Sequence, residues 1–186
     1  METEDMLETL LQGNQLKRTD RTGWTQRGVP AAESVAAHSY GVVFTTMLLA
    51  ELVTAEIDLG RALALAVLHD LPEARTSDIP RPAWRYLPVG SKEQAERQAM
   101  SEILDGLPFA ADWLALWDEL TANESAPARL VHDADRIDLY LQAWVYEQQS
   151  GNRRLAEFWA RPATFHYPEA EALYRALRQR REASGR

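Results

Sequence analysis

The chain has 186 residues, of which 46% are apolar and 26% charged, as is usual for a folded globular domain. Its formal net charge of −8 argues against a nucleic-acid polymer or an anionic membrane surface as partner, because proteins that bind them present basic surfaces. The absence of cysteine excludes disulfides and thiolate metal sites and fits a cytoplasmic protein.

Helical periodicity dominates the chain, and no segment alternates in the manner of a strand. The first helix is expected at 3–16, an amphipathic segment with apolar Met6, Leu7, Leu10 and Leu11. Further helices are expected at 34–56, 60–71, 91–105, 110–121, 126–149, 153–160 and 168–182. The most apolar stretch, 42–53, is too short and too polar to span a bilayer.

This pattern predicts an all-α, single-domain helical bundle over residues 1–186. Its core is expected at about 10–150, with the C-terminal helices 153–182 packed on that core or at a subunit contact. Ser34 is a candidate N-cap, and Ser91 with Gln94 resembles a capping box.

Two long segments, 17–33 and 72–90, lack periodicity and are expected to be loops. The first carries the cations Lys17, Arg18, Arg21 and Arg27. The second begins at Pro72, which lacks a backbone N–H and so ends the preceding helix. Ordered loops of this length are often functional.

Polar residues interrupt two apolar helices. His38 shares a helix face with Val35, Val42 and Leu49, so it points toward the core, where a packed histidine with one hydrogen bond is the plain alternative. Helix 60–71 is apolar on nearly all sides up to His69 and Asp70. A buried carboxylate is costly unless it is paired or binds a metal, although an Asp at a helix end can also face solvent.

A third group lies in helix 126–149, which carries His132, Asp133, Asp135 and Asp138. Periodicity does not choose among the three acids. Imidazoles and carboxylates that converge from three helices would form a mixed nitrogen and oxygen site suited to Mn, Fe, Co, Ni or Zn. Four protein ligands would leave positions open for water or substrate, as in catalytic metal sites.

These residues resemble the metal-binding pattern of the HD-domain superfamily of phosphohydrolases. Four stretches are similar to one branch, the 5′-deoxynucleotidases and their close relatives, and they follow its order over roughly residues 10–148. The stretches are LKRTDRTGW with the following RG, ESVAAHSY, ALAVLHDLPEARTSDIP and DADRIDLYLQAWVYE. The resemblance implies the HD-domain fold, with a metal site between helices.

The resemblance also implies roles for individual residues. One divalent metal per chain (Mn, Co, Mg, Fe, Ni or Zn) would be bound by His38, His69, Asp70 and Asp135. Asp135 is chosen because the family's ligand precedes a basic or small residue and then a hydrophobic one. Glu73 and Asp78 match the two acids that follow the doublet and are candidate catalytic groups. Ala37 occupies a position that is acidic in many relatives, and in those relatives the acid supports the histidine ligand.

The basic loop is similar to the family's phosphate-contacting segment, which makes Arg18 and Arg21 candidate phosphate ligands. A solvated loop is the alternative for both. Trp24 is expected either to stack on the base or sugar of a nucleotide or to pack in the core.

The implied activity is metal-dependent hydrolysis of deoxynucleoside 5′-monophosphates by a homodimer. Three alternatives remain: a hydrolase of another nucleotide phosphoester or pyrophosphate, a catalytically silent metal- or nucleotide-binding scaffold, and a metal-free bundle.

Overall fold

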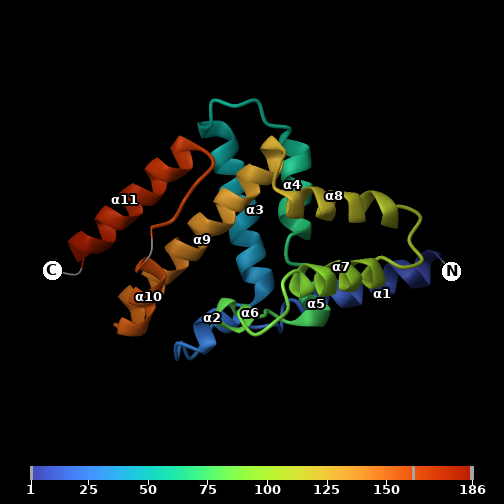
Figure 1. Ribbon diagram of the computed structural model, residues 1–186, viewed down its shortest axis with the longest axis horizontal. Coiled ribbons are helices and arrows are strands. Elements are labelled where there is room, and N and C mark those ends of the chain that lie inside the picture. The colour runs from blue at the N-terminus through green and yellow to red at the C-terminus, as the bar shows by residue number, and fades with distance from the viewer. Residues whose placement is uncertain (1, 161, 185–186) are drawn as a thin grey trace.

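The computed structural model describes residues 2–160 and 162–184, and over these ranges the chain forms helices and no β-strand (Figure 1). The predicted all-α, single-domain class is confirmed. The helices of ten residues or more are α1 (Glu2–Gln15), α3 (Val35–Leu52), α4 (Leu59–Leu68), α7 (Ser91–Ile103), α8 (Ala110–Ala122), α9 (Ala126–Ser150) and α11 (Pro168–Ser184). Short turns are α2 (Thr22–Thr25), α5 (Glu73–Thr76), α6 (Arg81–Trp84), η1 (Arg153–Leu155) and α10 (Ala156–Trp159).

Helix α3 is the centre of the bundle and packs against both α4 and α9. Val42, Leu49, Leu65 and Leu130 are fully buried where these three helices meet. With a mean hydropathy of 1.3, α3 is long and apolar enough to cross a membrane by composition, but here it is a core helix of the bundle. The start of α3 and the end of α4 lie at the same end of the molecule, near α2 and α5 (Figure 1).

The C-terminal part of the chain packs on α9. Helix α11 runs beside α9 (Figure 1), and an aromatic cluster joins them. That cluster includes Tyr140, Tyr146, Trp159 and Tyr174. The C-terminal part also contacts the start of α9, because the Tyr167 hydroxyl donates to the Ala126 carbonyl.

Most predicted helices end within a few residues of their observed bounds, and the exceptions have local causes. Helix α3 ends at Leu52 rather than 56, because Val53 turns into an extended conformation (φ −69°, ψ 142°). Helix α4 ends at Leu68, so His69 and Asp70 lie in the turn that follows it.

Of the two predicted helix N-caps, one is confirmed and the other is wrong. Ser34 caps α3 as predicted, because its hydroxyl accepts a hydrogen bond from the Ala37 N–H. The capping box at Ser91 and Gln94 is wrong. Gly90 caps α7 in a left-handed conformation (φ 81°), while the Ser91 hydroxyl donates to the Pro88 carbonyl.

Helix α1 presents its apolar stripe to solvent, contrary to the expectation from its amphipathic pattern. The exposed side chains are Met6, Leu7, Leu10 and Leu11. The contacts with the rest of the protein come from smaller residues. The Thr9 hydroxyl donates to the Ile103 carbonyl at 3.0 Å, and Gly13 lies close to Leu71.

Candidate metal centre

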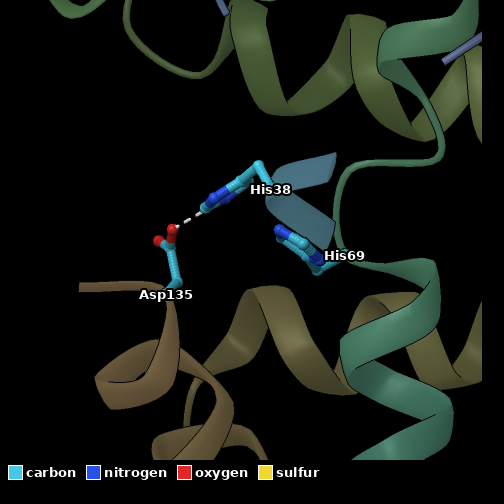
Figure 2. Close-up of side chains that lie close together, drawn as sticks. All are labelled: His38, His69 and Asp135. Atoms are coloured by element: carbon cyan, nitrogen blue, oxygen red, sulfur yellow. Dashed lines mark ion pairs between the residues drawn. The ribbon is translucent and has the colours of Figure 1, made fainter. Parts of the chain in front are cut away.

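His38 lies in the first turns of α3, and an acid from α9 lies close to each of its ring nitrogens. Its Nδ1 lies 2.8 Å from Asp138 Oδ2, and its Nε2 lies 3.2 Å from Asp135 Oδ1 (Figure 2 shows the Asp135 contact). Only 1% of the residue is exposed. Burial and Arg21 lower the pKa of His38, but the two carboxylates outweigh them and raise it to about 10.

His69 and Asp70 reach the same place from the turn after α4. His69 Nδ1 lies 2.8 Å from the Ala66 carbonyl oxygen, so this nitrogen carries the proton. Asp70 Oδ2 lies 3.2 Å from His69 Nε2 and 3.7 Å from His38 Nε2. Burial raises the pKa of Asp70, but His69, Arg21 and His38 outweigh it and hold that pKa below its usual range.

The donor set fits a divalent cation. The Nε2 atoms of His38 and His69 are buried and make no hydrogen bond. Ligand atoms of His38, His69 and Asp135 all lie within 4.8 Å of one another, and Asp70 contacts both histidines. Metal-binding histidines characteristically donate the other ring N–H to a carboxylate or a backbone carbonyl, as both do here. Mixed imidazole and carboxylate donors suit Mn, Fe, Co, Ni or Zn.

The other candidate polar residues of α9 are engaged elsewhere. Asp133 is fully buried and accepts hydrogen bonds from the backbone N–H groups of His166 and Tyr167, so it anchors the segment before α11. His132 contacts the Leu120 carbonyl at 2.9 Å. Of the three acids between which periodicity does not choose, Asp135 is the one that faces His38 Nε2.

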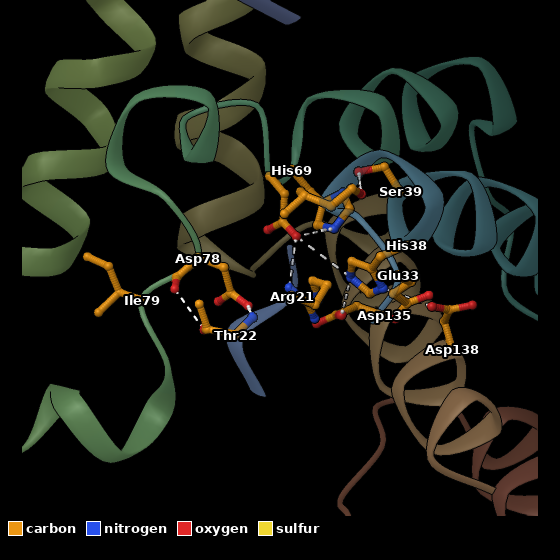
Figure 3. A network of polar contacts seen from close by, with 12 residues as sticks. Arg21, Thr22, Glu33, His38, Ser39, His69, Asp78, Ile79, Asp135 and Asp138 are labelled. Atoms are coloured by element: carbon orange, nitrogen blue, oxygen red, sulfur yellow. Dashed lines mark hydrogen bonds and ion pairs between the residues drawn. The ribbon is translucent and has the colours of Figure 1, made fainter. Parts of the chain in front are cut away.

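The basic loop brings Arg21 into the site. Its Nη1 lies 3.2 Å from Asp70 Oδ2. Two hydrogen bonds hold the loop in place: the Thr22 N–H donates to Asp78 Oδ2, and the Thr22 hydroxyl donates to the Asp78 carbonyl, both at 2.8 Å (Figure 3). Asp78 thus ties the segment after α5 to the loop that carries Arg21.

Glu73 begins α5 beside this group. It is 5% exposed, and its Oε2 is buried without a hydrogen-bond partner. Burial and the nearby Asp70 and Asp78 raise the pKa of Glu73 to about 9, although Arg21 opposes the shift. A carboxyl in this environment holds its proton at neutral pH.

Two predicted substrate contacts are not brought to this group. Arg18 is exposed, and its guanidinium donates to Gln15 Oε1 at 2.8 Å. The structure places Trp24 in the core, where the residue is 1% exposed. Its indole N–H donates to Glu33 Oε1, and its ring packs edge-on against Tyr146.

The sequence predicts Asp138 only as a possible metal ligand, and not the contact with His38 that the structure shows. Ligand atoms of Glu33, His38 and Asp138 (labelled in Figure 3) lie within 4.8 Å of one another. However, the Glu33 carboxylate accepts a hydrogen bond from Trp24, and Asp138 accepts one from His38. A spacing of 100 residues between His38 and Asp138 carries no local signal.

Comparison with known proteins gives consistent results. The HD domain family model matches residues 13–173. The 5′-deoxynucleotidase HDDC2 of Danio rerio is 32% identical over 96% of this chain and 88% of its own length, and that of Bos taurus is 34% identical over 97% and 87%. A conserved hypothetical protein from Pyrococcus furiosus has a similar structure, with a TM-score of 0.77 and 35% identity over 95% of this chain and 99% of that one. The resemblance seen in the sequence is confirmed, and the chain belongs to the HD-domain family.

Proposed function

We propose that this protein is a metal-dependent phosphomonoester hydrolase that releases phosphate from deoxynucleoside 5′-monophosphates. The observation that supports it most is the pair of buried imidazole Nε2 atoms, on His38 and His69, that make no hydrogen bond and lie against two carboxylates. The substrate class comes from the relatives named 5′-deoxynucleotidase.

In this proposal His38, His69, Asp70 and Asp135 hold one divalent cation. When bound, the cation supplies a Lewis acid that polarises the phosphoryl group and lowers the pKa of water. The Asp135 side chain is 39% exposed, whereas those of His38 and His69 are 1% and 8% exposed. Substrate therefore approaches from the Asp135 side, and the imidazoles stay shielded from bulk water.

Arg21 binds the phosphate in this proposal. One of its nitrogens is close to Asp70, and a guanidinium has five N–H donors, so the others remain for phosphoryl oxygens. Arginine suits this task because its planar fork matches two oxygens at once. Asp78 acts by holding the Thr22 backbone, which fixes the position of Arg21.

Glu73 acts as the general acid. Its raised pKa keeps it protonated at pH 7, so it can donate that proton to the 5′ oxygen as the phosphorus–oxygen bond breaks. Water supplies the oxygen that replaces the leaving group on phosphorus and gives up a proton, and Glu73 takes up a proton before the next turnover, so the number of protons is conserved. The two acids thus have different roles in this proposal: Glu73 transfers a proton, and Asp78 positions the phosphate-binding loop.

The test is phosphate release from matched ribo- and deoxynucleoside 5′-monophosphates, assayed with Mn²⁺, Co²⁺, Mg²⁺ and Zn²⁺. We expect metal-dependent release from the deoxynucleotides and its loss in Glu73→Gln. A protein that binds metal but releases phosphate from no monophosphate would refute the proposal and favour a silent scaffold. Release only from a phosphodiester or a pyrophosphate would favour the other HD-type hydrolases.

We further infer that the protein is a homodimer. The outer face of α3 carries an exposed apolar stripe, formed by Tyr40, Phe44, Met47 and Leu48. A two-fold axis would bring the same stripe of two copies together, so that each covers the other from water. Light scattering should report a dimer for the wild type and for Val89→Glu, which changes an exposed apolar residue in the segment between α6 and α7, and a monomer for Phe44→Glu. The cytoplasmic location stays a prediction, to be checked by cell fractionation.

A further inference from the structure

The environment of Asp138 indicates how this chain orients a metal ligand. Asp138 projects from α9 toward α3, and its Oδ2 accepts the hydrogen bond from His38 Nδ1 at 2.8 Å (Figure 3). Asp138 is 9% exposed and His38 is 1% exposed, so water has little access to this bond. The bond leaves only Nε2 of the ring to face Asp135 and Asp70.

Helix α3 makes room for the carboxylate at Gly41, three residues after His38. A Cβ atom at this position would lie 2.0 Å from Asp138 Oδ1 and 2.7 Å from its Cγ. Real Cβ atoms do not approach other atoms so closely, so any residue larger than glycine would displace the carboxylate or move the helices apart. Glycine inside a helix destabilises it by about 0.5–1 kcal/mol relative to alanine, so this position is costly unless the space is needed.

We propose that Gly41 and Asp138 form a positioning pair for His38: Gly41 leaves space on α3 for the Asp138 carboxylate, which fixes the ring so that Nε2 points to the metal. This inference rests on the proposed metal site. The residue directly before His38 is Ala37, which is exposed and has no acceptor group in its side chain. The supporting acid comes instead from α9.

The positioning has a chemical consequence. A histidine can bind a cation through Nε2 only if its remaining proton is on Nδ1, and an acceptor at Nδ1 selects that tautomer. A carboxylate acceptor also makes the ring a stronger ligand than a neutral acceptor would. The pair acts through His38 and does not touch the substrate.

The first test measures Zn²⁺ affinity of the full chain by competition with a chromogenic chelator. Asp138→Ala should weaken binding by about 10–100-fold, the range typical of such supporting residues. Asp138→Asn keeps an oxygen acceptor but loses the charge, and should fall between Asp138→Ala and the wild type. Gly41→Ala should match Asp138→Ala, because its new methyl group displaces the carboxylate.

The double variant, Gly41→Ala with Asp138→Ala, distinguishes this mechanism from a general destabilisation of α3. In Asp138→Ala the three atoms nearest to a Cβ at Gly41 are gone. Gly41→Ala should therefore cost no further Zn²⁺ affinity in that background. Gly13→Ala is the matched control: it also adds a methyl group to a helical glycine, but its nearest neighbour is 3.8 Å away, and it should bind Zn²⁺ as the wild type does.

The second readout is the Nδ1–H proton of His38 in the Zn²⁺-loaded protein, observed by NMR with ¹⁵N-labelled histidine. The chain has four histidines, so the resonance can be assigned by its loss in His38→Gln. It should be protected from exchange in the wild type and in Asp138→Asn, and be lost in Asp138→Ala and Gly41→Ala. A merely structural role for Asp138 predicts no such change in a folded variant.

The outcomes are decisive in either direction. Wild-type Zn²⁺ affinity in Asp138→Ala, or an additive loss in the double variant, would overturn the proposal. If Asp138→Ala does not fold, the nearly isosteric Asp138→Asn decides: weaker Zn²⁺ binding with a retained Nδ1–H resonance supports the pair, and unchanged affinity refutes it. A wild type that binds Zn²⁺ in this way but hydrolyses no nucleotide would refute the proposed function and leave the positioning pair intact.

Discussion

Replacing Glu73 with glutamine should stabilise the protein at neutral pH while it removes activity. The pKa of Glu73 is raised from 4.5 to about 9, first by burial and then by Asp70 and Asp78. A carboxyl whose pKa is higher in the folded state contributes most stability below its unfolded value, and this contribution is lost as the pH rises toward the folded value. The relevant window therefore runs from about pH 4.5 to about pH 9.

The magnitude follows from the pH difference. At pH 7 the Glu73 carboxyl is still protonated in the folded protein, whereas in the unfolded protein it ionises above about pH 4.5. At about 1.4 kcal/mol per pH unit, this destabilises the folded state by about 3 kcal/mol relative to a side chain that cannot ionise. Glutamine has the same shape without the titration, so the variant should escape this penalty.

Urea unfolding at pH 5, 6, 7 and 8, with a chelator present, measures the effect. The free energy of unfolding of Glu73→Gln should exceed that of the wild type by a margin that grows by about 1.4 kcal/mol per pH unit. At pH 7 the melting temperature should rise by about 6–12 °C. The exposed Glu124→Gln is the control and should run parallel to the wild type. If the free energy of unfolding of Glu73→Gln also differs from that of the wild type by the same amount at every pH, the raised pKa of Glu73 is refuted.

The same variant tests catalysis. Loss of a general acid should lower kcat for phosphate release by about 10²–10⁴-fold, while Zn²⁺ affinity stays close to that of the wild type. A saturating divalent cation should narrow the stability gap between the two proteins, because a nearby positive charge favours the ionised form of Glu73. Undiminished kcat would exclude Glu73 as the proton donor.

Further predictions concern the loop, the core and the metal. Arg21→Lys should raise KM for the monophosphate by about tenfold, since it loses bidentate binding, and an unchanged KM would place the phosphate elsewhere. Asp78→Asn should also raise KM, but have little further effect in the Arg21→Lys background if it acts only through Thr22. Trp24→Phe should lower the free energy of unfolding by about 1 kcal/mol through loss of the bond to Glu33, with KM unchanged; a raised KM would restore the stacking role. Zn²⁺ at 100 times its Kd should stabilise the fold by about 2.7 kcal/mol, measurable as a higher melting temperature, whereas an unchanged one would argue against a site specific to the folded state.

The fold was largely predictable because its signals are local. Apolar periodicity, prolines and caps such as Ser34 act within a few residues, and they identified each helix of ten residues or more. The orientation of α1 was not predictable in this way. Its stripe of Met6, Leu7 and Leu10 has the same period as a buried face, and only the docking of Thr9 against Ile103 determines which side faces the protein.

The candidate site was predictable only in part, because its parts meet through the tertiary fold. His38 and the turn after α4 stand out because they are polar groups in apolar helices. Asp135 and Asp138 are both plausible by periodicity, and the difference between them is which ring nitrogen of His38 each one meets. Trp24 was also ambiguous in the sequence, since an aromatic residue in a basic loop is as compatible with burial as with stacking.

The crowding of acids connects these features into one physical system. Asp70, Asp135 and Asp138 all contact His38, and Arg21 supplies a cation at Asp70. Like charges held this close are unfavourable, and a divalent cation at the imidazoles would relieve the repulsion. Burial and then Asp70 raise the pKa of Glu73, so removal of Asp70 should change metal affinity and proton transfer together. Asp138 is the informative exception, because it contacts His38 but is not among the charged groups that most affect the pKa of Glu73, so it should influence the metal far more than the acid.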